Sequence, residues 1–252
     1  MENILKIKNL KKTYHTLHEE IEAINDFSLD LKENEFVALV GPSGCGKSTI
    51  LKILGNLEEK SDGIVEMNDL KIGYMLQEDS LFDWLTIKEN CLLGLKIQNI
   101  LNKKNIQNVF RLLDTYGLKN FINSYPANLS GGMRQRVALI RTLAVAPDIL
   151  LLDEPFSALD YQTRLLVSDD VYRIIKNEGK SAIMVTHDIS EAISMSDKII
   201  VLSKRPASVK SVHEINLVTE GEKTPLKTRK VPQFQYYFDI LWKELDSYEI
   251  KQ

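Results

Sequence analysis

The chain has 252 residues, of which 44% are hydrophobic and 27% charged, and its formal net charge is -3. These values are typical of one large or two small globular domains, and they argue against the basic balance of a nucleic-acid-binding domain. No stretch approaches the about 20 apolar residues of a membrane span, and the first residues carry no secretory signal, so we expect a cytosolic chain. The two isolated cysteines, Cys45 and Cys91, predict neither a disulfide framework nor a zinc site.

The N-terminal segment predicts antiparallel strands with one face in water. Leu5 and Ile7 alternate with lysines, and the same period of two recurs over residues 27–31. We therefore expect a small antiparallel subdomain before the main core.

Continuous apolar runs then predict the buried parallel strands of an α/β core. Between the first and second of these runs, we expect a further strand at residues 72–76 and a helical subdomain inserted over about residues 78–131. Strand-like and helix-like segments alternate over most of the chain, which favours a mainly parallel sheet covered by helices. The apolar runs lie at residues 36–40, 149–152, 182–185 and 199–202.

The C-terminal part predicts a linker and one amphipathic helix. Residues 219–232 are polar and contain two prolines, which is typical of a loop. The domain is thus expected over 1–218, with a linker and a helix over 219–252. Helical spacing gathers six side chains into a stripe that we expect to pack on the domain: Phe234, Tyr237, Phe238, Leu241, Trp242 and Leu245.

A complete phosphate-binding motif follows the run at 36–40. Its glycines let successive N–H groups point at phosphate oxygens, and the following helix adds its positive end. Lys47 is expected to reach the β- and γ-phosphates, Ser48 to hold Mg²⁺, and Thr49 to add a phosphate contact. The motif reads Gly41, Pro42, Ser43, Gly44, Cys45, Gly46, Lys47 and Ser48.

Two carboxylates end the run at 149–152. Ligands of a parallel sheet lie at the carboxyl ends of its strands. Asp153 is therefore expected to hold Mg²⁺, directly or through water. Glu154 points differently and is expected to accept a proton from the attacking water.

The segment Leu129–Arg136, LSGGMRQR, resembles the signature motif of ATP-binding-cassette (ABC) proteins, about twenty residues before the Asp-Glu pair. A serine and two glycines before a helix make a second anion site. The resemblance implies a head-to-tail dimer in which Ser130, Gly131 and Gly132 close over ATP held by a partner chain. It also implies a P-loop NTPase fold with a RecA-like, mainly parallel core sheet.

Further positions match the family's landmarks. Gln77 resembles the glutamine that senses Mg²⁺ and the attacking water, and His187 resembles the histidine that contacts the γ-phosphate. Tyr14 resembles the aromatic residue that stacks on adenine, and residues 157–160 resemble the loop that meets the partner's phosphate cradle. Together with the phosphate loop and the acidic pair, these matches imply an ATPase that uses ATP and Mg²⁺.

The stretch from Gln77 to Thr86, with LSGGMRQRV and LSKRPAS, resembles the nitrate, sulfonate and taurine importer branch, although Asp83 stands where that branch often has proline. The resemblance implies a separate permease, an extracytoplasmic substrate-binding protein and a peripheral place on the cytoplasmic face of the membrane. The stretch between Gly63 and Gln77 is short for the branch, so a trimmed β-subdomain is expected. An ABC-type ATPase uncoupled from transport is the alternative, although such relatives usually carry coiled coils or a second cassette.

A small apolar group near the start of the helical subdomain has two interpretations. Phe82, Trp84 and Leu85 lie where cassettes of the family meet the permease, so they are candidates for a docking surface. They are equally candidates for the interior of the helical subdomain. The sequence leaves both open.

Overall fold

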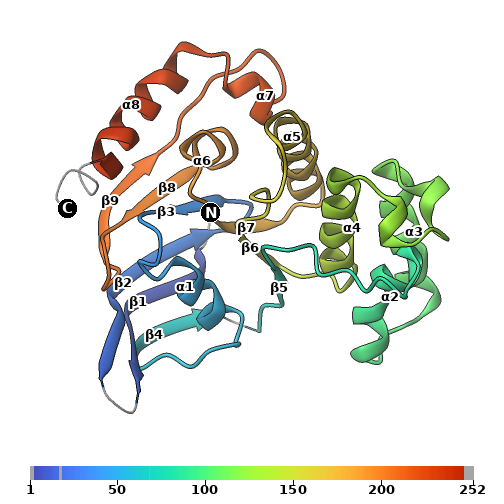
Figure 1. Cartoon of the computed structure of the whole chain (residues 1–252), viewed down its shortest axis with the longest axis horizontal. Coiled ribbons are helices and arrows are strands. Elements are labelled where there is room, and N and C mark those ends of the chain that lie inside the picture. The colour runs from blue at the N-terminus through green and yellow to red at the C-terminus, as the bar shows by residue number, and fades with distance from the viewer. Residues whose placement is uncertain (1–2, 17–18, 68, 247–252) are drawn as a thin grey trace.

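Two β-sheets organise the chain (Figure 1). The computed structural model describes residues 3–16, 19–67 and 69–246. The smaller sheet is antiparallel, with β1 (Asn3–His15) between β2 (Glu20–Lys32) and β4 (Asp62–Met67). The predicted antiparallel subdomain is therefore confirmed, and its sheet has three strands.

The larger sheet has six strands in the order β5-β6-β7-β3-β8-β9. All neighbouring pairs are parallel except β8 and β9, which are antiparallel. The predicted mainly parallel core is therefore confirmed, with an antiparallel edge strand that the apolar runs did not reveal. The strands are β3 (Phe36–Val40), β5 (Ile72–Met75), β6 (Ile149–Asp153), β7 (Ser181–Val185), β8 (Lys198–Leu202) and β9 (Val209–Glu214).

The central strands are apolar throughout because both faces of the sheet are covered. Ile149 and Leu151 of β6 enter one core, which includes α1 (Lys47–Leu54) and the smaller sheet. Leu150 and Leu152 enter the other core, which lies under the remaining helices. The period of two along β6 thus assigns alternate side chains to opposite cores.

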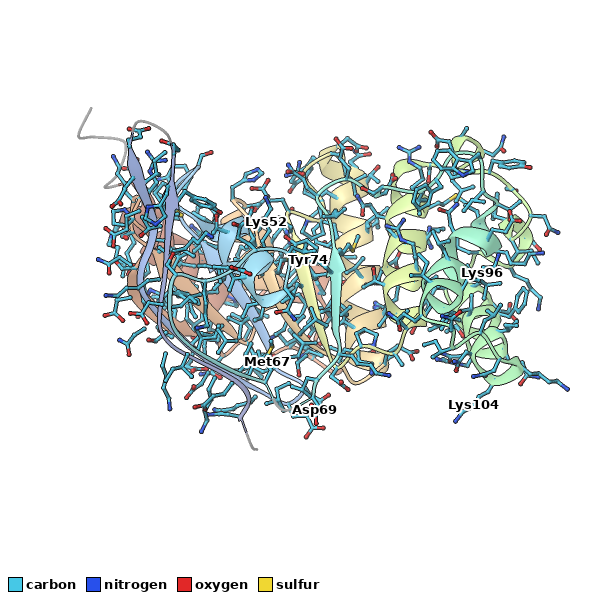
Figure 2. The ribbon with its side chains drawn as sticks, turned by 90° about the horizontal axis from the view of Figure 1, so that it is seen from below. Lys52, Met67, Asp69, Tyr74, Lys96 and Lys104 are labelled. Carbon is cyan, nitrogen blue, oxygen red and sulfur yellow. The ribbon has the colours of Figure 1, made fainter. Side chains whose placement is uncertain are left out.

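Helices α4 (Gly131–Ala144), α5 (Tyr161–Asn177) and α6 (Ile189–Met195) contribute to the second core. Beyond α4, helices α2 (Ile87–Ile97) and α3 (Lys103–Thr115) form an arm away from the sheet (Figure 1). Two short 3-10 turns, Lys119–Phe121 and Pro126–Asn128, lead from α3 back to α4. Lys96 and Lys104 lie in this arm, far from Tyr74 of β5 (Figure 2).

Side chains cap the N-termini of α2, α3 and α4. Thr86 and Glu89 form a reciprocal capping box at α2, and Asn102 caps α3. Ser130 caps α4 by accepting a hydrogen bond from Met133 N.

The C-terminal segment carries more structure than a linker. Within residues 219–232 lies a short helix, α7 (Pro225–Thr228), and the Thr228 hydroxyl donates to Ser194 O of α6 at 3.3 Å. Helix α8 (Pro232–Asp246) lays most of its apolar stripe on the second core, with Leu241 fully buried. Trp242 departs from the expected packing because it is 54% exposed.

Among residues 3–16, 19–67 and 69–246, no helix has the length and apolar character to cross a bilayer.

Candidate functional site

The phosphate-binding motif forms the loop between β3 and α1. Gly44 and Gly46 have φ of 69° and 123°, and a Cβ on Gly46 would lie 2.8 Å from Ala23 O, so only glycine fits there. Among the described residues no side chain caps α1, which leaves its first N–H groups facing the loop. The loop has the curvature that suits an anion.

Lys47 closes the loop from inside. Its ammonium donates to Gly41 O and Pro42 O, both at 2.8 Å, and the residue is buried. Cys45 is also buried, and burial raises the pKa of its thiol although the Lys47 ammonium opposes this shift. The Cys45 side chain therefore stays a neutral thiol, and its contribution to a phosphate site is its backbone.

Ser48 and Asp153 meet at the carboxyl edge of the sheet. The Ser48 hydroxyl donates to Asp153 Oδ1 at 2.9 Å, although the two residues are 105 positions apart. The Tyr74 hydroxyl donates to Asp153 Oδ2 at 3.0 Å. Burial, followed by the charge of Asp153, raises the pKa of Tyr74, so Tyr74 remains a donor.

The Ser48 hydroxyl and the Asp153 carboxylate fit a magnesium site. A hydroxyl and a buried carboxylate supply the oxygen ligands that Mg²⁺ takes, next to a phosphate-binding loop. Tyr74 was missed from the sequence because its contact with Asp153 joins two different strands. Tyr74 lies on β5 (Figure 2). Its ring packs closely on Gly55, because a Cβ there would lie 2.8 Å from Tyr74 Cδ2.

Glu154 and His187 form a second pair. His187 Nδ1 lies 3.1 Å from Glu154 Oε2. Glu154 has a φ of 45°, an uncommon backbone conformation for a side chain of this kind, while its N–H still donates to Val185 O at 2.9 Å. The left-handed turn separates the Glu154 carboxylate from that of Asp153, so adjacent residues serve different pairs.

Gln77 lies close to the turn after Glu154. Its Nε2 donates to the Ser157 hydroxyl at 3.4 Å, and that hydroxyl donates to Glu154 O at 3.1 Å. The Ser157 hydroxyl therefore links the Gln77 side chain to the main chain of Glu154.

Other predicted residues lie on other elements. Ser130, Gly131 and Gly132 begin α4, and no hydrogen bond or ion pair among the described residues joins them to residues 41–49. Tyr14 lies on β1, partly buried, with the Lys12 ammonium 4.7 Å from its ring centroid. One chain therefore assembles the phosphate loop with Asp153, Glu154 and His187, and leaves the α4 N-terminus outside this group.

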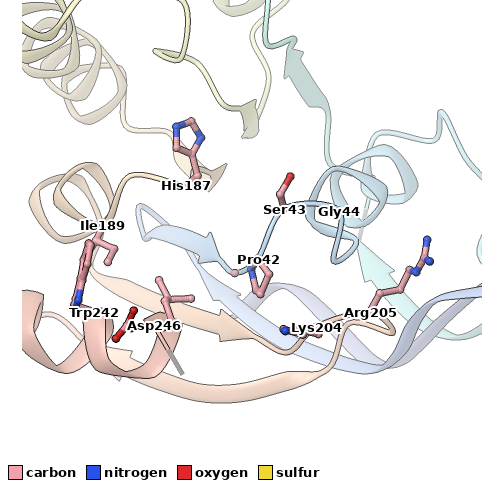
Figure 3. Close-up of a pocket in the computed structure, with 11 residues that line it drawn as sticks. Pro42, Ser43, Gly44, His187, Ile189, Lys204, Arg205, Trp242 and Asp246 are labelled. Atoms are coloured by element: carbon pink, nitrogen blue, oxygen red, sulfur yellow. The ribbon is translucent and has the colours of Figure 1, made fainter. Parts of the chain in front are cut away.

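A cleft of about 970 Å³ opens beside the phosphate loop. Ser43 and His187 line the side formed by the sheet edge, and Trp242 and Asp246 line the side formed by α8 (Figure 3). Arg205, from the connection between β8 and β9, also reaches it. The sequence did not place α8 at this cleft because an amphipathic stripe does not tell which element it will cover.

Comparison with known proteins agrees with this geometry. The ABC transporter family model matches residues 24–157. YtlC, an uncharacterized ABC transporter ATP-binding protein of Bacillus subtilis (strain 168), is 43% identical over 259 aligned positions, covering 99% of this chain and 98% of YtlC. The nitrate import ATP-binding protein NrtD of Synechocystis sp. is 35% identical, covering 93% of this chain and 92% of NrtD.

A solved structure has the same fold. The ATP-binding cassette MJ0796, in a dimeric post-hydrolysis state bound to ADP and Pi, matches with a TM-score of 0.70 and 33% sequence identity. The match covers 85% of this chain and all of the MJ0796 chain. The matched family, the relatives along the whole chain and the shared fold lead to one conclusion: this chain belongs to the ABC transporter family as an ATP-binding protein, an ABC-type ATPase.

Proposed function

We propose that this chain is the ATP-hydrolysing subunit of an importer whose permease is a separate membrane protein. The observation that carries the proposal is the pairing of Ser48 with Asp153 and of Glu154 with His187 beside one phosphate loop. The first pair holds Mg²⁺, and the second acts on the attacking water. The similarity to NrtD supports a small anion or organic solute of the nitrate, sulfonate or taurine type as cargo.

Binding of ATP rearranges Lys47. The β- and γ-phosphate oxygens replace Gly41 O and Pro42 O as acceptors for its ammonium. The N–H groups of residues 41–49 surround the phosphates, and Tyr14 stacks on the adenine. Ser48, Asp153 and Gln77 would hold Mg²⁺, which would supply positive charge to offset that of the phosphates.

Hydrolysis uses the second pair. Glu154 accepts a proton from water as the water oxygen bonds to the γ-phosphorus and the bond between that phosphorus and the β,γ-bridging oxygen breaks. The ring of His187, held against Glu154, contacts the γ-phosphate, and Gln77 orients the water. Catalysis of this kind depends on positioning and charge stabilisation, which suits a set of groups held on the ends of rigid strands.

The α4 N-terminus completes the site of a second cassette. Ser130, Gly131 and Gly132 present a helix end, yet within the described residues no hydrogen bond or ion pair joins them to their own phosphate loop. In a head-to-tail dimer they close over the ATP held by the partner, and residues 157–160 meet the partner's loop. The dimeric state of MJ0796 supports this arrangement.

The permease docks at the start of the helical arm. Trp84 is 72% exposed, and its ring lies 5.0 Å from that of Phe82, which is also exposed. The side chain of Asn90 fixes this turn by accepting from Phe82 N at 2.8 Å and donating to Leu85 O at 3.1 Å. The geometry therefore favours docking over the alternative of an interior cluster for Phe82 and Trp84.

Copurification with the permease tests the docking surface. We expect Phe82→Ala with Trp84→Ala to release the permease while ATP binding stays unchanged. Full copurification and full transport by this double variant would show that the permease binds elsewhere. The substrate-binding protein outside the membrane would reach this chain only through the permease.

Turnover by Glu154→Gln tests the proposed mechanism. Loss of a general base costs about 10²- to 10⁴-fold, so we expect turnover to fall at least about 100-fold while ATP affinity changes less than about threefold. The matched control is Glu66→Gln, which removes an exposed carboxylate on β4 whose ion pair with Lys8 lies at the surface. If Glu154→Gln retained more than about a tenth of wild-type turnover, Glu154 would not be the general base.

A further inference from the structure

Four ionisable side chains lie close to the segment that carries His187. Arg164 stands near the start of α5, Asp188 and Glu191 lie at the start of α6, and Arg229 follows α7. We call these residues the Arg164 cluster. They come from three elements, and none of them belongs to the phosphate loop or to the pairs described above.

Arg164 connects two loops of the site. Its guanidinium donates to Leu159 O at 3.0 Å, within the segment 157–160. On its other side it lies 3.4 Å from Asp188 Oδ2 and 3.8 Å from Glu191 Oε1. One side chain therefore contacts both the segment that follows Glu154 and the segment that carries His187.

Arg229 adds a second cation from the C-terminal segment. Burial lowers the pKa of the Arg229 guanidinium, while the charges of Asp188 and Glu191 oppose this shift and that of Arg164 adds to it. Arg229 Nε is buried and has no hydrogen-bond partner among the described residues. Its position is held by Leu226 N, which donates to Asp169 Oδ1 at 3.0 Å, and by the Thr228 hydroxyl on Ser194 O.

The two acids of the cluster fix the backbone on both sides of His187. Asp188 Oδ1 accepts from Ser190 N at 2.7 Å and from Glu191 N at 3.1 Å, which caps α6. Glu191 Oε2 accepts from the Thr186 hydroxyl at 2.7 Å, and that hydroxyl accepts from Asp188 N at 3.0 Å. Residues 186 and 188 are thus both held by the cluster, while the ring of His187 between them is left to meet Glu154.

We propose that Arg164 and Arg229 are positioning residues for ATP hydrolysis, which join the segment 157–160 and the C-terminal segment to the backbone that sets the His187 ring against Glu154. The inference rests on the proposed roles of Glu154 and His187. Because no hydrogen bond or ion pair in the described ranges joins the cluster to the phosphate loop, it acts on turnover and leaves nucleotide binding largely unchanged. The C-terminal segment of the cassette thereby becomes part of the hydrolytic machinery.

Steady-state kinetics of Arg229→Met test this inference. Remote members of such a network change rates by about 3- to 30-fold, so we expect kcat to fall within that range while KM for ATP stays within about twofold. Arg229→Lys keeps the charge and is expected to recover at least about half of the loss. Lys230→Met is the matched control, because Lys230 is the exposed neighbour in the same segment.

A double-mutant cycle separates positioning from general damage to the fold. If Arg229 acts through His187, the loss caused by Arg229→Met disappears in the His187→Ala background. Equal losses in both backgrounds, or equal kcat for Arg229→Met and Lys230→Met, would overturn the inference. If Arg229→Met does not fold, Arg164→Lys is measured in the same cycle under the same criteria.

The result that would contradict the proposed function differs from the one that would contradict this inference. Loss of turnover in Glu154→Gln upholds that function whatever the Arg229 variants do. If Glu154→Gln retains turnover, by contrast, Glu154 is not the base and the proposed mechanism is wrong.

Discussion

Asp153 shows how single residues of the site are held. Its two carboxylate oxygens accept from Ser48 and Tyr74, which come from α1 and β5. The sequence predicted Asp153 and Ser48 because each belongs to a motif with a chemical reason for its spacing. Tyr74 and Arg164 belong to no motif, and their roles arise from contacts with residues far along the chain. Such partners become visible only when the strand order is known.

Glu191 gives the clearest pH dependence. Burial, helped by the charge of Asp188 and opposed by the Thr186 hydroxyl and Arg164, raises the pKa of Glu191 to about 7 from 4.5. Because the folded-state pKa lies above the unfolded value, the unfolded chain releases its proton first as pH rises. The stability contribution is therefore fully present below about pH 4.5 and is lost as pH rises through about 7.

Urea unfolding of wild type and Glu191→Gln checks this sign. From about pH 5 to about pH 7.5, we expect the free energy of unfolding of wild type to fall by about 2 kcal/mol relative to the variant. A difference that stays constant, or that changes in the opposite direction, would show that Glu191 is ionised in the folded chain across this range.

At the scale of elements, continuous apolar runs were sufficient to predict β3, β6, β7 and β8. These strands are buried on both faces, so their composition alone distinguishes them. Helix α7 escaped prediction because four residues are too few for a periodic pattern. Strands β4 and β9 escaped it because each alternates between partly exposed and exposed positions and has no apolar run.

The contact between β4 and β1 depends on Gly63. Its φ is 93°, and a Cβ there would lie 2.5 Å from Asn9 O and 2.7 Å from Leu10 Cα, which are backbone atoms that cannot move aside. We therefore expect Gly63→Ala to destabilise the chain by at least about 2 kcal/mol, from backbone strain together with steric overlap.

Gly179→Ala is the matched comparison for Gly63→Ala. Gly179 also has a positive φ, of 61°, but the nearest atom to its Cβ would be 3.6 Å away. It should lose only about 1 kcal/mol to backbone strain. Equal losses of unfolding free energy in the two variants would show that close packing of β4 on β1 adds nothing.

At the scale of the whole molecule, the chain keeps its candidate ATP-binding groups in two sets. Hydrogen bonds pair Ser48 with Asp153 and Glu154 with His187, while no hydrogen bond or ion pair in the described part of the chain joins Ser130 to residues 41–49. Helix α4, which Ser130 caps, adjoins the arm (Figure 1). The signature motif could be recognised from the sequence. Its separation from the phosphate loop required the fold.

The proposed head-to-tail dimer can be tested because it places these two sets of groups, from different chains, around one ATP. Each ATP then lies between Lys47 of one chain and Ser130 of the other. Lys47→Ala removes the ammonium group that binds the phosphates of ATP. Ser130→Asp keeps a side chain able to cap α4 but places a negative charge against the partner's ATP. Each variant alone has two defective sites, whereas a mixed dimer has one intact site.

The most direct measurement of the central claim is the ATP turnover of Lys47→Ala and Ser130→Asp mixed in equal amounts. A site shared between two chains predicts turnover well above the sum of the separate variants, rising to about a quarter of wild type, because half the dimers are mixed and each has one of two sites intact. A mixture of Lys47→Ala with Glu154→Gln should stay inactive, since both residues belong to the same chain's half of the site. A Lys47→Ala and Ser130→Asp mixture no faster than the sum of its parts would contradict a catalytic site shared between two cassettes.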